Sequence, residues 1–281
     1  MVRKNNFIVE DEEELFHYTS SDGLLGILRS NTLWFTDYSV LNDESEGRYV
    51  FDMAKKVIKE NPIYDKVYID IALPAIGRNL TSRCFICSFS RNSDSLPLWS
   101  NYSKNVSKFG YNFSLKVSDL KRSINKNTFL TNPSVVVDSI VYNEEDQKKI
   151  IKSVIDKFYK AWLKGTSKSA IQEFLSADLR LWRFKFKHSA FESEDEVRAY
   201  IHISDEEFST LLRGKEDVIK FRSINGIFAP YIEVPIDINS IGQITLSPML
   251  KGVEAGNSVA FLCEKYGLRC KIKHSEIPLR Y

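Results

Sequence analysis

The chain has 281 residues, a formal net charge of +2, 43% hydrophobic residues and 27% charged residues. This composition is typical of a folded globular protein and excludes a disordered one. The balanced charge provides no field that would by itself gather nucleic acid or an acidic membrane, although it does not exclude a nucleic-acid substrate. Residues 1–14 contain no apolar signal core, and no stretch approaches 18 uninterrupted apolar residues. The sequence therefore predicts a cytoplasmic protein that neither is secreted nor spans a membrane.

The four cysteines lie at positions 84, 87, 263 and 270, within apolar stretches of the sequence. The spacing of Cys84 and Cys87 resembles half of a zinc site, but residues three apart on a strand face opposite ways, and no second pair follows. Reduced, buried thiols and no metal site are predicted.

Hydrophobic periodicity, caps and turn residues predict alternating strands and helices in the first half of the chain. The expected order is a strand at 14–19, a helix capped by Ser21-Asp22 and ending near Asn31, a strand at 32–36, a helix from an Asp43 cap to about Glu60, a helical stretch at 64–78 broken by Pro74, a buried strand at 83–89, a short turn at 97–102, and strands at 111–115 and 135–142 on either side of a small helix.

The second half begins with two helical stretches rich in lysine and aromatic residues, at 144–164 and 167–185. Strands are expected next at 196–203, 218–223, 227–234, 243–246 and 268–272, with a hairpin turn at Asn225-Gly226 and a helix at 248–266 that ends before Gly267. The fold class is therefore α+β, with a mixed or antiparallel sheet. We expect a single domain over residues 1–281, with a helical insertion at 143–187.

His17 lies between Phe16 and Tyr18 on the first predicted strand, so its side chain faces away from theirs and lies beside Thr19. These two polar groups would suit a binding site. An alternative interpretation is a core histidine that is hydrogen-bonded to a backbone carbonyl.

A second polar group occurs where a helical region gives way to a strand. Glu194, Glu196 and Arg198 share one side if that strand is regular, which would place a carboxylate pair beside a guanidinium. A solvated acidic turn with a salt bridge is the alternative. Trp99 and Tyr102, three residues apart, either cover a pocket or pack in the core.

The sequence contains no phosphate-binding P-loop, no Gly-x-Gly-x-x-Gly and no Gly-x-Ser-x-Gly. Short segments dispersed along the chain, from Leu15 to its end, instead resemble a bacterial family catalogued as domain of unknown function 2971. The matching pieces are Phe16–Ser20 with Leu25, Ile27 and Leu28, Leu33-Trp34, Leu41–Glu46, Cys87–Ser90, Leu98-Trp99 with Tyr102, Phe186–His188 through Phe191 with Glu194, Glu196 and Arg198, and Ser275–Pro278.

The order of elements also resembles, more loosely, the DarT-like branch of the ADP-ribosyltransferases. This resemblance implies that NAD is the substrate, that Glu196 is the catalytic carboxylate with His17, and that these side chains line one cleft with Trp99 or Tyr102. The leading hypothesis is therefore an NAD-consuming ADP-ribosyltransferase, or an NAD glycohydrolase-like enzyme, that acts as an effector in phage defence or a toxin system. The acceptor of a transferred group would be a protein or a nucleic acid. The residues implied to bind NAD are His17, Thr19, Ser20, Ser88, Ser90, Trp99, Tyr102 and Arg198.

Two other functions compete with this one. A metal-dependent nuclease or hydrolase would use Asp43, Glu46, Glu194 and Glu196 as oxygen ligands. A sensor or binding module without catalysis would keep only a degenerate pocket.

Overall fold

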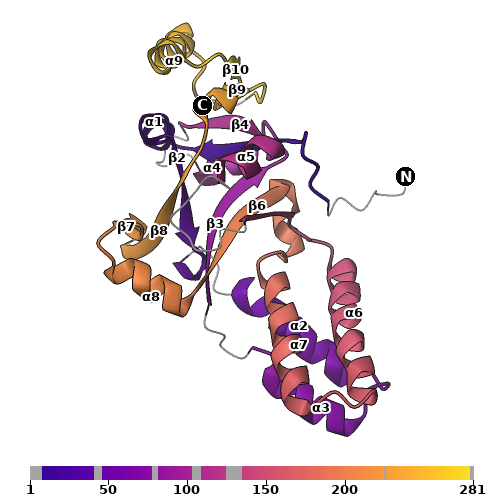
Figure 1. Ribbon diagram of the computed structural model, residues 1–281. Coiled ribbons are helices and arrows are strands. Elements are labelled where there is room, and N and C mark those ends of the chain that lie inside the picture. Colours follow the sequence, from indigo (N-terminus) through magenta and orange to yellow (C-terminus); the bar gives the residue numbers. More distant parts are fainter. Residues whose placement is uncertain are drawn as a thin grey trace. The chain divides into compact units, whose positions relative to one another are not determined.

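The computed structural model describes residues 8–40, 46–77, 82–102, 109–124, 135–224 and 226–278 (Figure 1). The chain divides into two compact units. The first contains Met1–Val40, Ser82–Ser139 and Ser193–Tyr281, and the second contains Leu41–Thr81 and Ile140–Glu192. None of the helices in the described ranges is both long enough and apolar enough to cross a bilayer.

A single mixed sheet forms the framework of the first unit. Its main path runs β10-β9-β4-β1-β3-β2-β8-β7, and β6 pairs with both β3 and β5. Neighbouring strands are antiparallel, except that β9 and β10 are parallel. The predicted α+β class with a mixed sheet is confirmed. The strands are β1 (Glu14–Thr19), β2 (Thr32–Asp37), β3 (Ser82–Ser90), β4 (Tyr111–Lys116), β5 (Val135–Ser139), β6 (Glu196–Ser204), β7 (Lys220–Ile224), β8 (Ile227–Pro235), β9 (Gln243–Leu246) and β10 (Lys271–His274).

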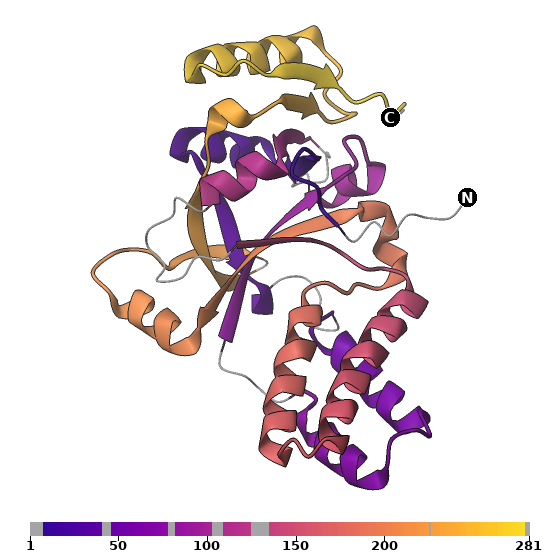
Figure 2. The ribbon, with the colours of Figure 1, turned by 45° about the vertical axis from the view of Figure 1, so that its right-hand side comes forward.

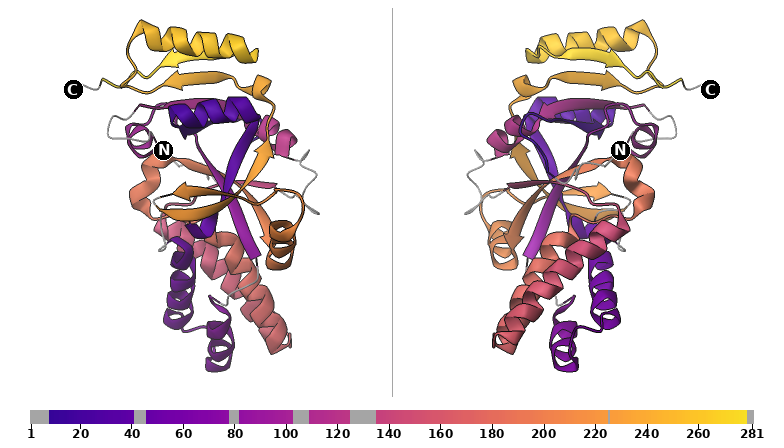
Figure 3. Two further views of the ribbon diagram at one scale, coloured as in Figure 1. Left: turned by 90° about the vertical axis from the view of Figure 1, so that its left-hand side faces the viewer. Right: turned by 90° about the vertical axis from the view of Figure 1, so that its right-hand side faces the viewer.

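One face of this sheet carries the main hydrophobic core. Leu15, Phe35, Phe85 and Val197 point into it from four strands, and α1, α5, α8 and α9 supply further buried side chains. Helix α9 and strand β10 lie together at the end of the sheet beyond β9 (Figure 3). The helices of this unit are α1 (Ser21–Ser30), α4 (Leu96–Tyr102), α5 (Val117–Ile124), α8 (Asp205–Arg213) and α9 (Val253–Tyr266), with short 3-10 turns at Tyr38–Val40 and Ile238–Ser240.

The opposite face carries polar residues in the middle of the sheet. Directly paired residues of antiparallel strands share a face, so the pairs Ser88↔Arg198, Ser90↔Glu196 and Thr36↔Tyr231 can be followed from strand to strand. Because Thr36 also pairs with Ile86, two residues before Ser88, all three pairs lie on one side. We call this side the polar face. It includes Trp34, Thr36, Ser88, Ser90, Glu196, Arg198, Arg222 and Tyr231.

Strand β3 is paired unequally along its two edges. One edge pairs with β6 over the whole strand. The other edge pairs with β2 at Phe85 and Ile86, and with β1 only through Phe16↔Ser90. The sheet therefore divides between β1 and β2 beside residues Cys87 to Phe89, and we call this gap the split.

The second unit is helical. Its elements are α2 (Glu46–Glu60), α3 (Lys66–Ala72), a 3-10 turn at Leu73–Ala75, α6 (Glu144–Leu163) and α7 (Lys168–Arg183) (Figure 2). Tyr64 and Tyr68 link its two chain segments, because their hydroxyls donate to Asp156 Oδ1 and the Ile155 carbonyl at 2.6 and 3.0 Å. The segment predicted as an insertion, 143–187, lies within this unit beside α2 and α3. The single domain over 1–281 stays a prediction.

Several predicted boundaries are corrected. The strand expected at 135–142 ends at Ser139, the helix expected from 248 begins at Val253, and the last strand begins at Lys271 rather than 268. Ser20, not Ser21-Asp22, caps α1, because its Oγ accepts from the Gly23 N–H at 3.1 Å. Helix α8 was not predicted. The Asp43 cap and Asn225 lie outside the described residues.

Candidate functional site

A buried ion pair occupies the centre of the polar face. Glu196 and Arg198 are two residues apart on β6, and the side chain of each is only 5% exposed. Arg198 donates from Nε to Glu196 Oε1 at 2.7 Å and from Nη2 to Oε2 at 3.0 Å. The Ser88 hydroxyl donates to the same Oε1 at 2.7 Å. The predicted sharing of a side by Glu196 and Arg198 is confirmed, and these hydrogen bonds fix the carboxylate in one orientation.

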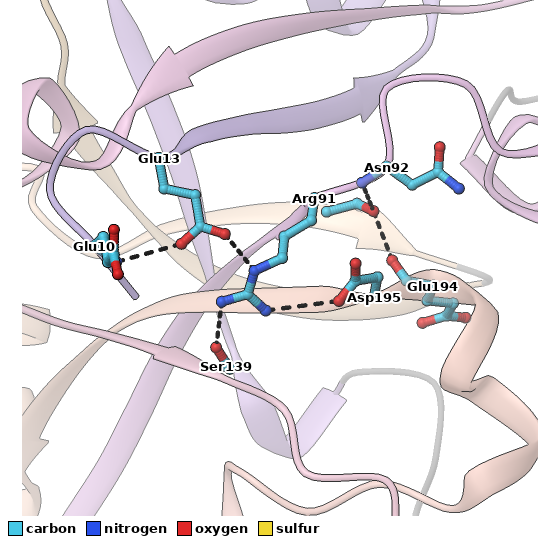
Figure 4. Close-up of polar contacts among 8 residues, drawn as sticks. Glu10, Glu13, Arg91, Asn92, Ser139, Glu194 and Asp195 are labelled. Carbon is cyan, nitrogen blue, oxygen red and sulfur yellow. Dashed lines mark hydrogen bonds and ion pairs between the residues drawn. The ribbon is translucent and has the colours of Figure 1, made fainter. Parts of the chain in front are cut away.

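Arg91 contacts Asp195, Ser139 and Glu13, and so connects the turn that precedes β6 with other parts of the sheet (Figure 4). Its backbone N–H donates to the Asp195 carbonyl at 3.0 Å, and its guanidinium lies 3.6 Å from the Asp195 carboxylate. The same guanidinium donates to Ser139 Oγ at 2.6 Å and to Glu13 Oε1. Asp195 has a φ of +41°, which a residue with a Cβ rarely adopts. Arg91 therefore helps to hold the unusual turn from which β6 starts.

Glu194 lies in a 3-10 turn (Ser189–Glu194), not on the strand, so the prediction that it shares a strand face with Glu196 is wrong. The positive φ of Asp195 breaks the regular alternation between them. Ser90 ties this turn to β3: its buried hydroxyl donates to the Glu194 carbonyl at 2.6 Å and accepts from the Asn92 N–H at 3.0 Å (Figure 4). These contacts give Ser90 a structural role.

His17, on β1, lies beside the split and contacts the backbone of Ser88 on β3. Its Nδ1 donates to the Ser88 carbonyl at 2.9 Å, and its ring contacts Phe89 and Phe113 with centroid separations of 5.5 and 5.4 Å. Both phenylalanines belong to the core, so His17 points to the core face and does not share the polar face with Glu196. Ser88 joins the two, binding His17 through its carbonyl and Glu196 through its hydroxyl.

Burial lowers the pKa of His17 below its ordinary value; the hydrogen bond to Ser88 opposes this shift, and the positive charge of Arg222 adds to it. Because a carbonyl oxygen only accepts, Nδ1 carries the hydrogen of the neutral ring. Nε2 of His17 is then an acceptor at neutral pH. Burial also raises the pKa of the neighbouring Cys87 thiol to about 12.

The remaining predicted residues lie around these groups. Thr19 packs closely on α1, because a Cβ at Gly23 would lie 2.0 Å from Thr19 Oγ1. Trp99 is 1% exposed and packs edge-on against Tyr18 at 4.6 Å, in a small hydrophobic cluster with Phe16 and Leu98 that is separate from the main core. Tyr102, three residues further along α4, is 37% exposed.

Two polar groups of this region were not predicted from the sequence. Tyr38, in the turn after β2, presents its ring to the Arg198 guanidinium at 6.0 Å. Arg222 crosses from β7 to β2, where Nη2 donates to Thr36 Oγ1 at 2.7 Å. No local motif marks either residue, since their positions depend on strand pairings that are distant in sequence.

The alternative metal site gains no support from the described residues. Within them no group of three or more His, Cys, Asp or Glu side chains is placed to hold a metal ion. Asp43, one of the expected ligands, lies outside the described ranges.

Comparisons with known proteins bear on the same segments. The family model described as "Protein of unknown function (DUF2971)" matches residues 98–199, which include Trp99, Tyr102, Glu196 and Arg198. The resemblance to that family is thus confirmed over this segment. The structure of DarT from Thermus sp. 2.9 in complex with NAD+ is similar at 11% sequence identity and a TM-score of 0.35, covering 96% of this chain and 98% of that chain. No curated protein matches the chain.

Proposed function

We propose that this chain binds NAD and breaks its nicotinamide–ribose bond, with Glu196 as the catalytic carboxylate. The ADP-ribose then passes to water, as in a glycohydrolase, or to a protein or nucleic-acid acceptor, as in a transferase. An effector of phage defence or of a toxin system would use this chemistry.

The reaction needs a fixed negative charge beside the ribose. When the bond from the anomeric carbon to nicotinamide breaks, its electron pair leaves with the nicotinamide nitrogen, and the ribose gains oxocarbenium character. A carboxylate held in place stabilises that positive charge without having to reorganise. The incoming oxygen forms the new bond to the anomeric carbon and loses its proton to a base, for which Glu196 is the nearest candidate on the polar face.

The observation that carries the proposal is the buried Glu196 carboxylate, oriented by Ser88 and Arg198. An ion pair serving stability alone would gain little from this arrangement, because removing two charges from water costs much of what their attraction returns. Ser88 is only partly buried, so the side of the carboxylate nearest to it is where a ligand can approach.

His17 and Thr19 extend the proposed site at the split. In this proposal His17 supports the site from the core face, because its Nδ1 donates to the carbonyl of Ser88, whose hydroxyl donates to Glu196. Arg198 would act through Glu196 as a positioning residue. Ser20, Ser90 and Trp99 have structural partners, so in this proposal they shape the site without touching NAD.

The decisive experiment measures nicotinamide release from NAD by the purified full chain, alone and with cell extract or nucleic acid as acceptor source. Glu196→Gln keeps the size of the side chain and its acceptor oxygen for Ser88. We expect it to reduce the rate at least about 100-fold, as expected for loss of electrostatic stabilisation. Glu206→Gln, on an exposed position of α8, is the matched control and should keep the wild-type rate.

Equal rates for Glu196→Gln and wild type would contradict the assignment of Glu196. A wild-type chain that binds NAD but releases no nicotinamide under any of these conditions would overturn catalysis and leave a binding module. Absence of both binding and release would overturn the whole proposal.

A further inference from the structure

Arg222 is a half-buried cation that pairs with none of the described carboxylates. No ion pair joins it to an acid in the described part of the chain, and its hydrogen-bonded partner there, Thr36, is neutral. The acid nearest to it in the strand pairing, Glu233, is already engaged by Lys220 at 2.8 Å. A guanidinium removed from water usually needs an anion beside it.

The present position of the side chain also leaves one donor unsatisfied. Arg222 Nε is buried and finds no hydrogen-bond partner among the residues that the structure describes. An unpaired buried donor costs free energy, so an arrangement that pairs it with an acceptor is favoured. A phosphate offers what is missing, because its oxygens match the fork of parallel N–H groups on a guanidinium.

An aromatic platform adjoins this cation. The Trp34 and Tyr231 rings lie 4.5 Å apart between centroids, and the Arg222 guanidinium is 5.4 Å from the Trp34 ring. Trp34 is 39% exposed, although it is a large aromatic residue in the middle of a strand. Exposed aromatic side chains beside a guanidinium are a common means of binding a nucleobase.

The cluster borders the site around Glu196. Arg222, Trp34 and Thr36 lie on the polar face with Ser88, and Thr36 pairs with Ile86, two residues before Ser88. Arg222 is close enough to His17 and Cys87 at the split for its positive charge to lower the pKa of each.

From this geometry we propose that Arg222 and Trp34 bind the phosphate-bearing part of a nucleotide, while the buried Thr36 hydroxyl holds the guanidinium. Arg222 turns its guanidinium, including the unsatisfied Nε donor, to the phosphate, and Trp34 contacts the base or the sugar. The assignment deepens the proposed function, because the ligand would be the adenosine diphosphate portion of NAD, but it requires no catalysis.

The test is a titration of the full chain with ADP, measured by isothermal calorimetry at fixed ionic strength. We expect Arg222→Gln to weaken ADP binding about 10- to 100-fold, the loss expected for a charge-assisted hydrogen bond to phosphate. Arg222→Lys keeps the charge but loses the fork, and it should give an intermediate affinity. Arg213→Gln, on an exposed position at the end of α8, is the control and should bind like wild type.

Further ligands separate the phosphate from the base. Adenosine should bind more weakly than ADP and should not respond to Arg222→Gln, whereas inorganic pyrophosphate should respond. Succinate binding in preference to pyrophosphate would overturn the phosphate assignment in favour of a carboxylate ligand.

The failure of this assignment can be distinguished from failure of the catalytic proposal. ADP binding is measured without turnover, so its outcome does not depend on whether the chain releases nicotinamide. Wild-type ADP affinity in both Arg222 variants, or no ADP binding by the wild-type chain, overturns the Arg222 site while the nicotinamide-release experiment still decides the role of Glu196.

Discussion

Removing the positive charge from Arg198 should strongly destabilise the first unit. Arg198→Met would leave the Glu196 carboxylate buried with only the Ser88 hydroxyl from this set of donors. A buried ion pair that loses one partner typically costs 3–5 kcal/mol, so we expect the free energy of unfolding to fall by about 3–5 kcal/mol. Replacing both residues, as Glu196→Leu with Arg198→Met, should restore most of the loss because no uncompensated charge remains.

Urea unfolding measures these differences, provided that the signal comes from the first unit. Trp34 and Trp99 lie in that unit, and Trp162 and Trp182 lie in the second, so Trp162→Phe and Trp182→Phe provide a background in which fluorescence follows the sheet. Lys121→Met is the control, because Lys121 forms an exposed pair with Asp11 and should change the free energy of unfolding by at most about 1 kcal/mol.

Two results would refute this reasoning. A loss below about 1 kcal/mol in Arg198→Met would mean that the carboxylate finds other compensation. A double variant as unstable as the sum of the two single variants would mean that the charges do not stabilise one another.

Three further predictions follow from the same contacts. Because the pKa of His17 is lowered in the folded chain, the unfolded state binds the proton more readily. The free energy of unfolding should therefore be constant above about pH 6.5 and fall below it, by up to about 1.4 kcal/mol per pH unit. An unchanged slope in His17→Gln would contradict this. Asp195→Gly should be more stable than Asp195→Val by about 1–2 kcal/mol in thermal unfolding. Both variants lose the ion pair with Arg91, but only valine is strained at a φ of +41°. Equal stability of the two variants would refute a cost of strain. Cys263 and Cys270, with sulfur atoms 3.7 Å apart, should form a disulfide when hydrogen peroxide accepts their two electrons and two protons to give water; peptide mass mapping without reductant should find this bond, and a pair that stays reduced would disprove it.

Local patterns were sufficient to predict the strands that frame the site. The alternation around His17 gave β1 with its observed bounds, and the pattern from Glu196 to Ile203 gave nearly all of β6. The partnership of Glu196 with Arg198 followed from period-two alternation alone. Helix α8 was missed although Ser204 and Glu207 carry a capping signal, seen in the hydrogen bond from the Glu207 N–H to Ser204 Oγ.

Other features depend on contacts that no local pattern encodes. The face of His17 relative to Glu196 is set by the pairing of β3 with β1 and β6, which joins residues more than seventy positions apart. Glu194 leaves the strand because Asp195 adopts a positive φ, and Arg91 supports that turn from the position just after β3. Arg222 reaches Thr36 across β8, over 186 positions of sequence.

The single pairing of β1 with β3 has a mechanical consequence. On that edge, Phe16↔Ser90 connects the strands on the β1 side to those on the β2 side, and the hydrophobic core beneath is shared by both. Separating β1 from β3 would break the one residue pair given for these strands, whereas separating β3 from β6 would break nine. Fluctuations of the sheet should concentrate at the split, on the microsecond to millisecond timescale of collective motions. A ligand entering there would meet the least extensively paired part of β3, whereas the Glu196 carboxylate lies on β6, which pairs with β3 at nine positions.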